Sequence, residues 1–142
     1  IQSIVDFSAL FGRIVVVTNQ QGIGKKLMSE EDLAVVHGEL ISQVEKSGGT
    51  IDAIYFAPQL AAENSPMRKP NIGMPLKAQE DFPEIAFSKS ILVGDSASDI
   101  EFANRAGMKA VFISDMEENE VHFYTLESLA ALSDCLKMVR NK

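Results

Sequence analysis

The amino-acid sequence predicts an α/β fold in which a parallel sheet is covered by helices on both faces. Three observations predict it. Segments with helical periodicity alternate along the chain with short apolar runs. The first of these runs is apolar and β-branched at nearly every position, as in strands buried on both faces. Finally, 142 residues with 46% hydrophobic content can bury one core. We therefore expect a single domain over residues 1–142 that binds ligands at the carboxyl ends of its strands.

The first elements are expected to be a helix, a strand and a second helix. Apolar residues at helical spacing indicate that the chain opens in a helix, and the run RIVVVTN, residues 13–19, indicates a fully buried strand. Ser29 with Asp32 resembles a capping box at the start of a long amphipathic helix, which is expected to stop at Gly48-Gly49. The apolar stripe of this helix consists of Leu33, Val36, Leu40, Ile41 and Val44.

The rest of the chain continues the alternation. The strand IDAIYFAP, residues 51–58, leads into a polar loop and a short helix near Pro75 to Phe82. The later elements are expected to be the strand SILVGD (90–95), the helix SDIEFANRAG (98–107), the strand KAVFIS (109–114) and a helix from Thr125 or Leu126 to Leu136.

Charge and composition narrow the possible partners. The formal net charge is −7, and no basic cluster extends beyond Lys25-Lys26, so neither nucleic acid nor an anionic membrane is an expected partner. No apolar run approaches the roughly 20 residues that span a bilayer, and the N-terminus lacks the layout of a signal peptide. The single cysteine, Cys135, has no disulfide partner in the chain, which fits a reducing compartment. We expect a cytoplasmic protein.

The stretch IVVVTNQQGIGKK, residues 14–26, looks like a phosphate-binding loop but does not match the usual patterns. A P-loop requires glycine where Asn19 stands and Ser or Thr where Lys26 stands. The dinucleotide-binding pattern requires a third glycine where Leu27 stands. What remains is a strand that carries Thr18, Asn19 and Gln20 to its carboxyl end, where their hydroxyl and amide donors could face an anion.

Polar clusters follow three of the predicted strands: Thr18-Asn19, Arg68-Lys69, and Asp95 with Asp99. Each has a simpler interpretation, namely turn chemistry for the Thr-Asn pair, a solvated loop lysine, and, for Asp99, an acid that favours a helix start. Asp95 and Asp99 can also converge on a hard cation. Taken together, a hydroxyl, a lysine and a carboxylate pair supply the hydrogen bonding, positive charge and Mg²⁺ ligation that phosphoryl transfer requires.

The order of these motifs resembles that of the haloacid-dehalogenase-like (HAD-like) phosphohydrolases, and most closely the branch of heptose-bisphosphate and histidinol-phosphate phosphatases. VTNQQGI (17–23), RKPNIGM (68–74) and VGDSASD (93–99) are similar to the second, third and fourth motifs of that branch. The resemblance covers about Ile14 to Ser114. It implies a Rossmann-like, three-layer α/β/α fold and a Mg²⁺-dependent phosphomonoester hydrolase that acts on a small sugar phosphate or histidinol-phosphate-like metabolite.

The same resemblance implies a role for each site residue. Thr18 would bind the transferring phosphoryl group and Lys69 would neutralise it. Asp95 would ligate Mg²⁺, with Asp99 supporting that metal site. Asn19 and Arg68 would help to bind phosphate or substrate.

Two departures from the family pattern shape further expectations. The first motif, Asp-x-Asp, supplies the nucleophile in the family, whereas Asp6 is the only acidic residue before Thr18 here and lies in a helical pattern. We therefore expect a sheet that lacks its first strand and a chain that is inactive by itself. Several relatives also hold a structural zinc with a loop that begins Cys-Pro-His. Ala57, Pro58 and Gln59 stand there, so zinc is not expected.

Two alternative functions come from other classes. The first is a catalytically inactive phosphate-binding or assembly domain of the same fold, which an upstream strand ending in Asp-x-Asp would argue against. The second is a signalling receiver domain, which also uses Asp, Thr and Lys at strand ends but places its acids first. Here Thr18 precedes Lys69 and Lys69 precedes Asp95, so the receiver interpretation is set aside.

Overall fold

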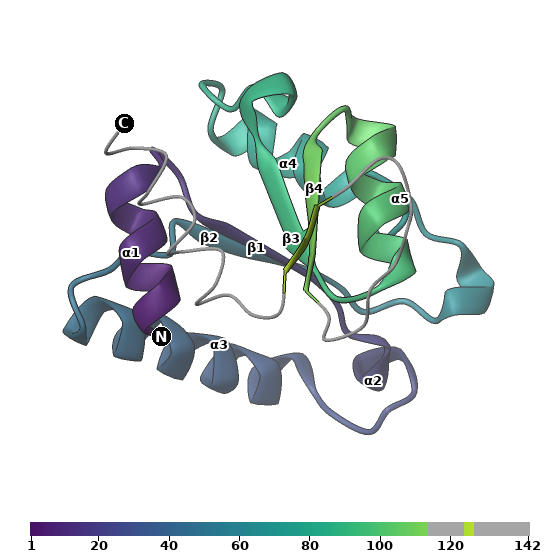
Figure 1. Ribbon diagram of the computed structural model, residues 1–142. Coiled ribbons are helices and arrows are strands. Elements are labelled where there is room, and N and C mark those ends of the chain that lie inside the picture. The colour runs from purple at the N-terminus through teal and green to yellow at the C-terminus, as the bar shows by residue number, and fades with distance from the viewer. Residues whose placement is uncertain (114–123, 127–142) are drawn as a thin grey trace. The chain divides into compact units, whose positions relative to one another are not determined.

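The computed structural model describes residues 1–113 and 124–126, shown coloured in Figure 1. The chain divides into two compact units, Ile1–Glu84 and Ile85–Lys142. Each unit contains parallel strands, so the predicted parallel α/β fold is confirmed. The single-domain assignment over residues 1–142 stays a prediction.

The first unit is built on a two-stranded parallel sheet. β1 pairs with β2 in register from Val15 opposite Ala53 to Asn19 opposite Ala57. A parallel pair needs a long crossover between its strands, and the chain provides one that contains a 17-residue helix, α3. The elements of this unit are α1 (Gln2–Leu10), β1 (Val15–Asn19), α2 (Gln21–Gly24), α3 (Glu30–Lys46), β2 (Ala53–Ala57), η1 (Ala61–Glu63) and α4 (Gly73–Asp81).

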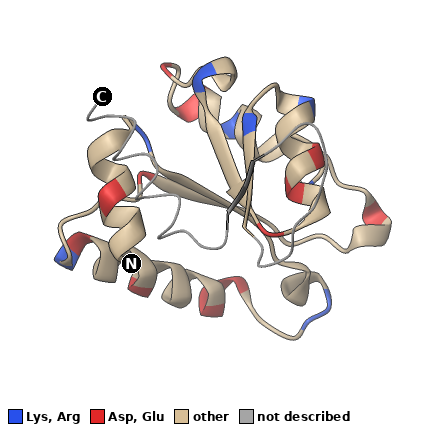
Figure 2. Cartoon of the chain, viewed as in Figure 1, with Lys and Arg blue, Asp and Glu red and all other residues tan. Residues whose placement is uncertain are grey.

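The helix α3 begins at the predicted capping box. Asp32 N donates to Ser29 Oγ at 3.0 Å, and Ser29 N donates to Asp32 Oδ2 at 3.1 Å. Acidic residues occupy its first turn and Lys46 its last, as the helix dipole favours, and Figure 2 shows these charges along the helix. The predicted apolar stripe is correct at Leu33 and Val44, which are buried, but wrong at Val36, which is 56% exposed because it does not face the core.

The expectation that the strand β1 is fully buried is wrong. All five of its residues are half-buried. In a sheet of two strands each strand has a hydrogen-bonded neighbour on one side only, which explains the incomplete burial. The expectation that a further strand belongs beside it stays a prediction.

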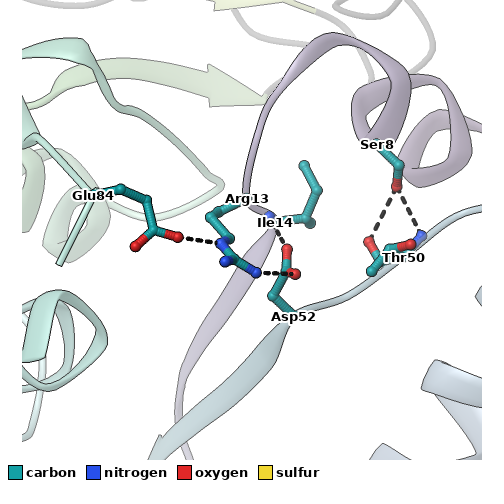
Figure 3. Close-up of polar contacts among 6 residues, drawn as sticks. All are labelled: Ser8, Arg13, Ile14, Thr50, Asp52 and Glu84. Carbon is teal, nitrogen blue, oxygen red and sulfur yellow. Dashed lines mark hydrogen bonds and ion pairs between the residues drawn. The ribbon is translucent and has the colours of Figure 1, made fainter. Parts of the chain in front are cut away.

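Polar contacts fasten the amino ends of β1 and β2 (Figure 3). Arg13 Nη1 lies 3.0 Å from Asp52 Oδ1, and Ile14 N donates to Asp52 Oδ2 at 2.8 Å. Arg13 Nε also lies 2.6 Å from Glu84 Oε1, and its guanidinium carbon lies 4.6 Å from the centre of the Phe82 ring. Hydrogen bonds to the two carboxylates, that to Glu84 first, raise the pKa of Arg13. One side chain thus joins the starts of both strands to the segment after α4.

The second unit contains a three-stranded parallel sheet in the order β3-β4-β5. Its elements are η2 (Phe87–Lys89), β3 (Ile91–Gly94), α5 (Ala97–Ala106), β4 (Lys109–Ile113) and β5 (Tyr124–Leu126). Ile100 and Ala103 from α5 form a buried cluster with Ala110 and Phe112 from β4. The helix ends at Gly107, whose φ of +75° is the left-handed value that favours glycine.

Two expectations for the end of the chain have different outcomes. Tyr124–Leu126 is a strand paired with β4, so a helix does not begin at Thr125 or Leu126. Pairing with β4 determines the conformation of Tyr124–Leu126, whereas the helix was predicted from local residue spacing alone. Residues 127–136 of the predicted helix, and Cys135 with them, lie outside the described residues. No helix within the described ranges is both long and apolar enough to cross a membrane.

Candidate functional site

Thr18 and Asn19 are the last two residues of β1, as predicted. Gln20 N donates to Ala57 O at 2.8 Å, which continues the parallel ladder one residue beyond the strand. Gln20 Nε2 donates to Thr18 Oγ1 at 3.1 Å. A hydroxyl that accepts one hydrogen bond can still donate its own proton, and Thr18 Oγ1 donates to Asn19 O at 3.4 Å. Gln20 therefore helps to orient the Thr18 hydroxyl as a donor. The sequence pattern predicted Gln20 at this strand end as a donor beside Thr18 and Asn19, but it assigned Gln20 no role in the site.

Asn19 and Lys69, separated by 50 residues in sequence, are joined by two hydrogen bonds. Lys69 N donates to Asn19 Oδ1 at 3.0 Å, and Asn19 Nδ2 donates to Lys69 O at 3.4 Å. The Lys69 ammonium reaches back along the strand to Val17 O at 3.4 Å. The structure therefore brings two predicted site residues together at the carboxyl end of β1.

The loop that carries Lys69 is braced by its own side chains and by one glycine. Asn71 Nδ2 donates to Ser65 O at 3.0 Å and to Asn64 Oδ1 at 3.1 Å. Gly73 N donates to Pro66 O at 2.8 Å. A Cβ at Gly73 would lie 2.5 Å from that same oxygen, so the close approach requires glycine.

Within the part of the chain that the structure describes, two buried side-chain atoms of this unit lack a hydrogen-bond partner: Arg68 Nη1 and Gln59 Oε1. Buried polar groups are nearly always paired, so an unpaired one calls for an explanation such as a bound ligand or water. For Arg68 the missing partner must be an acceptor, and a phosphate oxygen is a strong one. Arg68 precedes Lys69 directly, which places its backbone at the Asn19 contact.

The glycine loop after β1 has a packing role in this structure. Residues Gln21–Gly24 form the short helix α2, and Gly24 N donates to Pro58 O at 3.0 Å. A Cβ at Gly24 would lie 2.6 Å from that oxygen. Lys25 and Lys26 are exposed. The glycine thus allows α2 to pack against the segment that follows β2.

In the second unit, Asp99 organises the turn that carries Asp95. Asp99 Oδ2 accepts hydrogen bonds from Asp95 N at 3.2 Å, Ser96 N at 3.2 Å and Ser96 Oγ at 2.8 Å. Asp99 is only 5% exposed, and a Cβ at Gly94 would lie 2.4 Å from its carboxylate. The Asp95 residue itself is exposed. The turn therefore fixes the Asp95 backbone at the end of β3 and leaves the side chain accessible.

The helix-start interpretation of Asp99 agrees with this geometry, since Asp99 and Ser96 form a capping box at α5. Its role as a metal ligand, like that of Asp95, stays a prediction. Among residues 1–113 and 124–126, no group of three or more His, Cys, Asp or Glu side chains is arranged to hold a metal ion.

Comparison with known proteins gives the family. Residues 66–122 match the family model described as HAD-hydrolase-like. The chain is also 40% identical over 97 residues to D-glycero-alpha-D-manno-heptose-1,7-bisphosphate 7-phosphatase of Mycobacterium bovis, an alignment that covers 68% of this chain and 51% of that protein. The chain belongs to the HAD-like hydrolases. This confirms the resemblance drawn from the three sequence motifs.

Two further proteins are similar to the HAD-like chain. It is 31% identical over 125 residues to the histidine biosynthesis bifunctional protein HisB of Legionella pneumophila, over 87% of this chain and 33% of that protein. The crystal structure of D,D-heptose 1,7-bisphosphate phosphatase from B. bronchiseptica, complexed with magnesium and phosphate, matches with a TM-score of 0.83 at 22% identity. That match covers 99% of this chain and 82% of the other, and it shows a shared Rossmann-like fold. The chain spans about half the length of the M. bovis relative (51%).

Proposed function

We propose that the HAD-like chain is part of a Mg²⁺-dependent phosphomonoester hydrolase that acts on a small sugar phosphate or histidinol-phosphate-like metabolite. The single observation that carries the proposal is the pair of hydrogen bonds that ties Lys69 to Asn19, next to Thr18. These bonds hold the main chain of the residue that bears a cation beside the strand end that bears a hydroxyl, and phosphoryl transfer needs both groups. The names of the relatives, heptose-bisphosphate phosphatases and HisB, support the substrate class.

In this proposal the residues of the first unit bind the phosphoryl group. The Thr18 hydroxyl, oriented by Gln20, donates to a phosphoryl oxygen in place of its contact with Asn19 O. The Lys69 ammonium offsets the substrate's negative charge, which a chain with net charge −7 would otherwise repel. Arg68 Nη1, buried and without a partner, gains the acceptor that it lacks.

The Asp95 turn fits a magnesium ion by its donor chemistry. Mg²⁺ is usually held by one or two carboxylates together with waters and substrate phosphates, so one accessible strand-end carboxylate is sufficient as the protein's anchor. When bound, the ion would neutralise developing charge on the phosphoryl group. Asp95 would hold it, and Asp99 would keep the Asp95 backbone in place through the hydrogen bond at 3.2 Å.

The attacking group in the proposal is an aspartate outside these 142 residues, which would form a phospho-aspartate intermediate. Asp6 is the only acidic residue before Thr18. It lies within α1, where its Oδ1 accepts from Gln2 Nε2 at 3.0 Å, and this position in a helix does not fit a strand-end nucleophile.

The test is hydrolysis by the full-length gene product of a panel that contains heptose bisphosphates, histidinol phosphate and an uncharged-ester control. Release of phosphate is expected from at least one phosphomonoester with Mg²⁺ and none in excess chelator. Turnover that is unchanged by the chelator would contradict the proposal.

A second candidate is a phosphate-binding or assembly domain that keeps the fold without the chemistry. The absence of Asp-x-Asp from the 142 residues favours it. Saturable binding of inorganic phosphate by the full-length product, with no turnover of any panel member, would support this candidate over the hydrolase.

A further inference from the structure

We propose that Asn19 is a positioning residue that holds the main chain of Lys69, rather than a ligand of the phosphate. The inference rests on the proposed function, since it assigns Asn19 a task within the same site. It differs from the sequence-based expectation, in which Asn19 binds phosphate or substrate directly.

The geometry of the contact carries the proposal. The Asn19 carboxamide accepts from the Lys69 amide at 3.0 Å and donates to the Lys69 carbonyl at 3.4 Å. These are the two main-chain groups that a neighbouring strand would satisfy in a sheet. A carboxamide can replace such a strand because it carries a donor and an acceptor side by side, which a hydroxyl or a carboxylate does not. Both atom types of the Asn19 side chain are therefore directed at Lys69.

The contact matters for the position of the ammonium. Lysine carries its charge on a flexible four-carbon chain, so the charge is well placed only if the backbone that bears it is held. Asn19 holds that backbone at the end of β1, and from there the Lys69 ammonium lies 3.4 Å from Val17 O. Small displacements of a charged group in a site that binds a transferring phosphoryl group are costly, because such catalysis depends on prepared geometry.

A double-mutant cycle separates positioning from direct binding. If Asn19 acts through Lys69, its loss should matter only while the Lys69 amine is present. If Asn19 binds phosphate itself, its loss should weaken activity by the same factor whether or not the amine is there. The variants are Asn19→Ala, Lys69→Met and the pair together, in the full-length protein. Asn104→Ala is the matched control, because Asn104 is exposed on α5.

We expect Asn19→Ala to lower kcat/KM by roughly 10- to 100-fold, as a misplaced catalytic group does. In the Lys69→Met background the same substitution should lower it by less than about twofold further. Equal factors in the two backgrounds would overturn the proposal.

Amide hydrogen exchange at Lys69, measured by NMR, tests the contact between Asn19 and Lys69 without depending on phosphatase activity. Asn19→Ala should speed exchange of the Lys69 amide by roughly tenfold or more relative to the parent and to Asn104→Ala. Asn19→Asp keeps an acceptor for that amide and should leave its exchange within about threefold of the parent. If Asn19→Ala does not fold, the test uses Asn19→Asp alone. The proposal is overturned if the Lys69 amide of Asn19→Asp exchanges as fast as an amide in an unstructured segment. A parent protein without phosphatase activity would refute the proposed function, while the exchange rates would still test the contact.

Discussion

At the scale of single residues, the site depends on side chains that orient other groups. Gln20 orients the Thr18 hydroxyl, Asn19 holds the Lys69 backbone, and Asp99 holds the backbone of Asp95. Each of these hydrogen bonds fixes the position of a residue that the proposed reaction would use. Substitutions of the reacting groups themselves should therefore affect turnover far more than stability.

Asp95→Asn is expected to lower kcat of the full-length protein by roughly 100-fold or more, because it removes the carboxylate assigned to Mg²⁺. The fold should be unaffected, since Asp95 is exposed and the new side chain has the same size. Steady-state kinetics and thermal unfolding measure the two effects. A kcat close to that of the parent would show that the fourth-motif assignment is wrong.

Lys69→Ala is expected to weaken both phosphate binding and turnover, because it removes the ammonium group that lies 3.4 Å from Val17 O of β1. The matched control is Lys25→Ala with Lys26→Ala, since both lysines are exposed after α2. Binding of inorganic phosphate and kcat/KM should change little in the control. If the control loses activity and Lys69→Ala keeps it, the glycine loop is the phosphate cradle after all.

At the scale of elements, close approach between segments limits which residues are tolerated. Two glycines in α2 differ in this respect: a Cβ at Gly24 would meet Pro58 O at 2.6 Å, whereas a Cβ at Gly22 would meet nothing within 4 Å. A second tie joins β2 to α4, where Tyr55 Oη donates to Asp81 Oδ2 at 2.5 Å. Each contact gives a prediction about stability.

Gly24→Ala is expected to destabilise the protein by about 1–3 kcal/mol, because the segment after β2 must move to admit a methyl group. Gly22→Ala should be neutral or slightly stabilising, because alanine favours a helix over glycine. Urea denaturation of both variants measures the difference. Equal stabilities would show that α2 and the Pro58 segment are not closely packed in solution.

The raised pKa of Tyr55 predicts that the free energy of unfolding falls at high pH. Burial, followed by the hydrogen bond to Asp81, raises the pKa of Tyr55 to about 12. A raised pKa in the folded state stabilises the protein below the unfolded pKa of about 10, and this contribution is lost as pH rises from there toward 12. Tyr55→Phe should therefore show a shallower fall of unfolding free energy between pH 10 and 12. Parallel curves for the two proteins would contradict the assignment.

At the scale of the whole molecule, the proposed chemistry requires more than the groups in this chain. In the proposed function the chain would supply a hydroxyl, cations and a carboxylate for Mg²⁺. Its only acid before Thr18 is Asp6, which lies in α1. The chain spans 51% of its M. bovis relative.

The 142-residue chain by itself is accordingly expected to release no phosphate from a phosphomonoester that the full-length product hydrolyses. The reason is the missing attacking carboxylate. Parallel assays with Mg²⁺ on both proteins measure this. Hydrolysis by the 142 residues, with phosphate trapped on Asp6 or another of their carboxylates, would refute the assignment of the nucleophile.

The sequence by itself determined most of the elements and the family, because both depend on local patterns. Apolar periodicity, the Ser29–Asp32 capping box and three short motifs are readable residue by residue. The tertiary structure alone decided which groups meet across long separations. The strand at Tyr124–Leu126 forms by pairing with β4, Gly24 is needed because Pro58 O lies against it, and Asn19 finds Lys69 across 50 residues. Such contacts leave no periodic signal in the sequence, since the spacing between the partners is set by the fold.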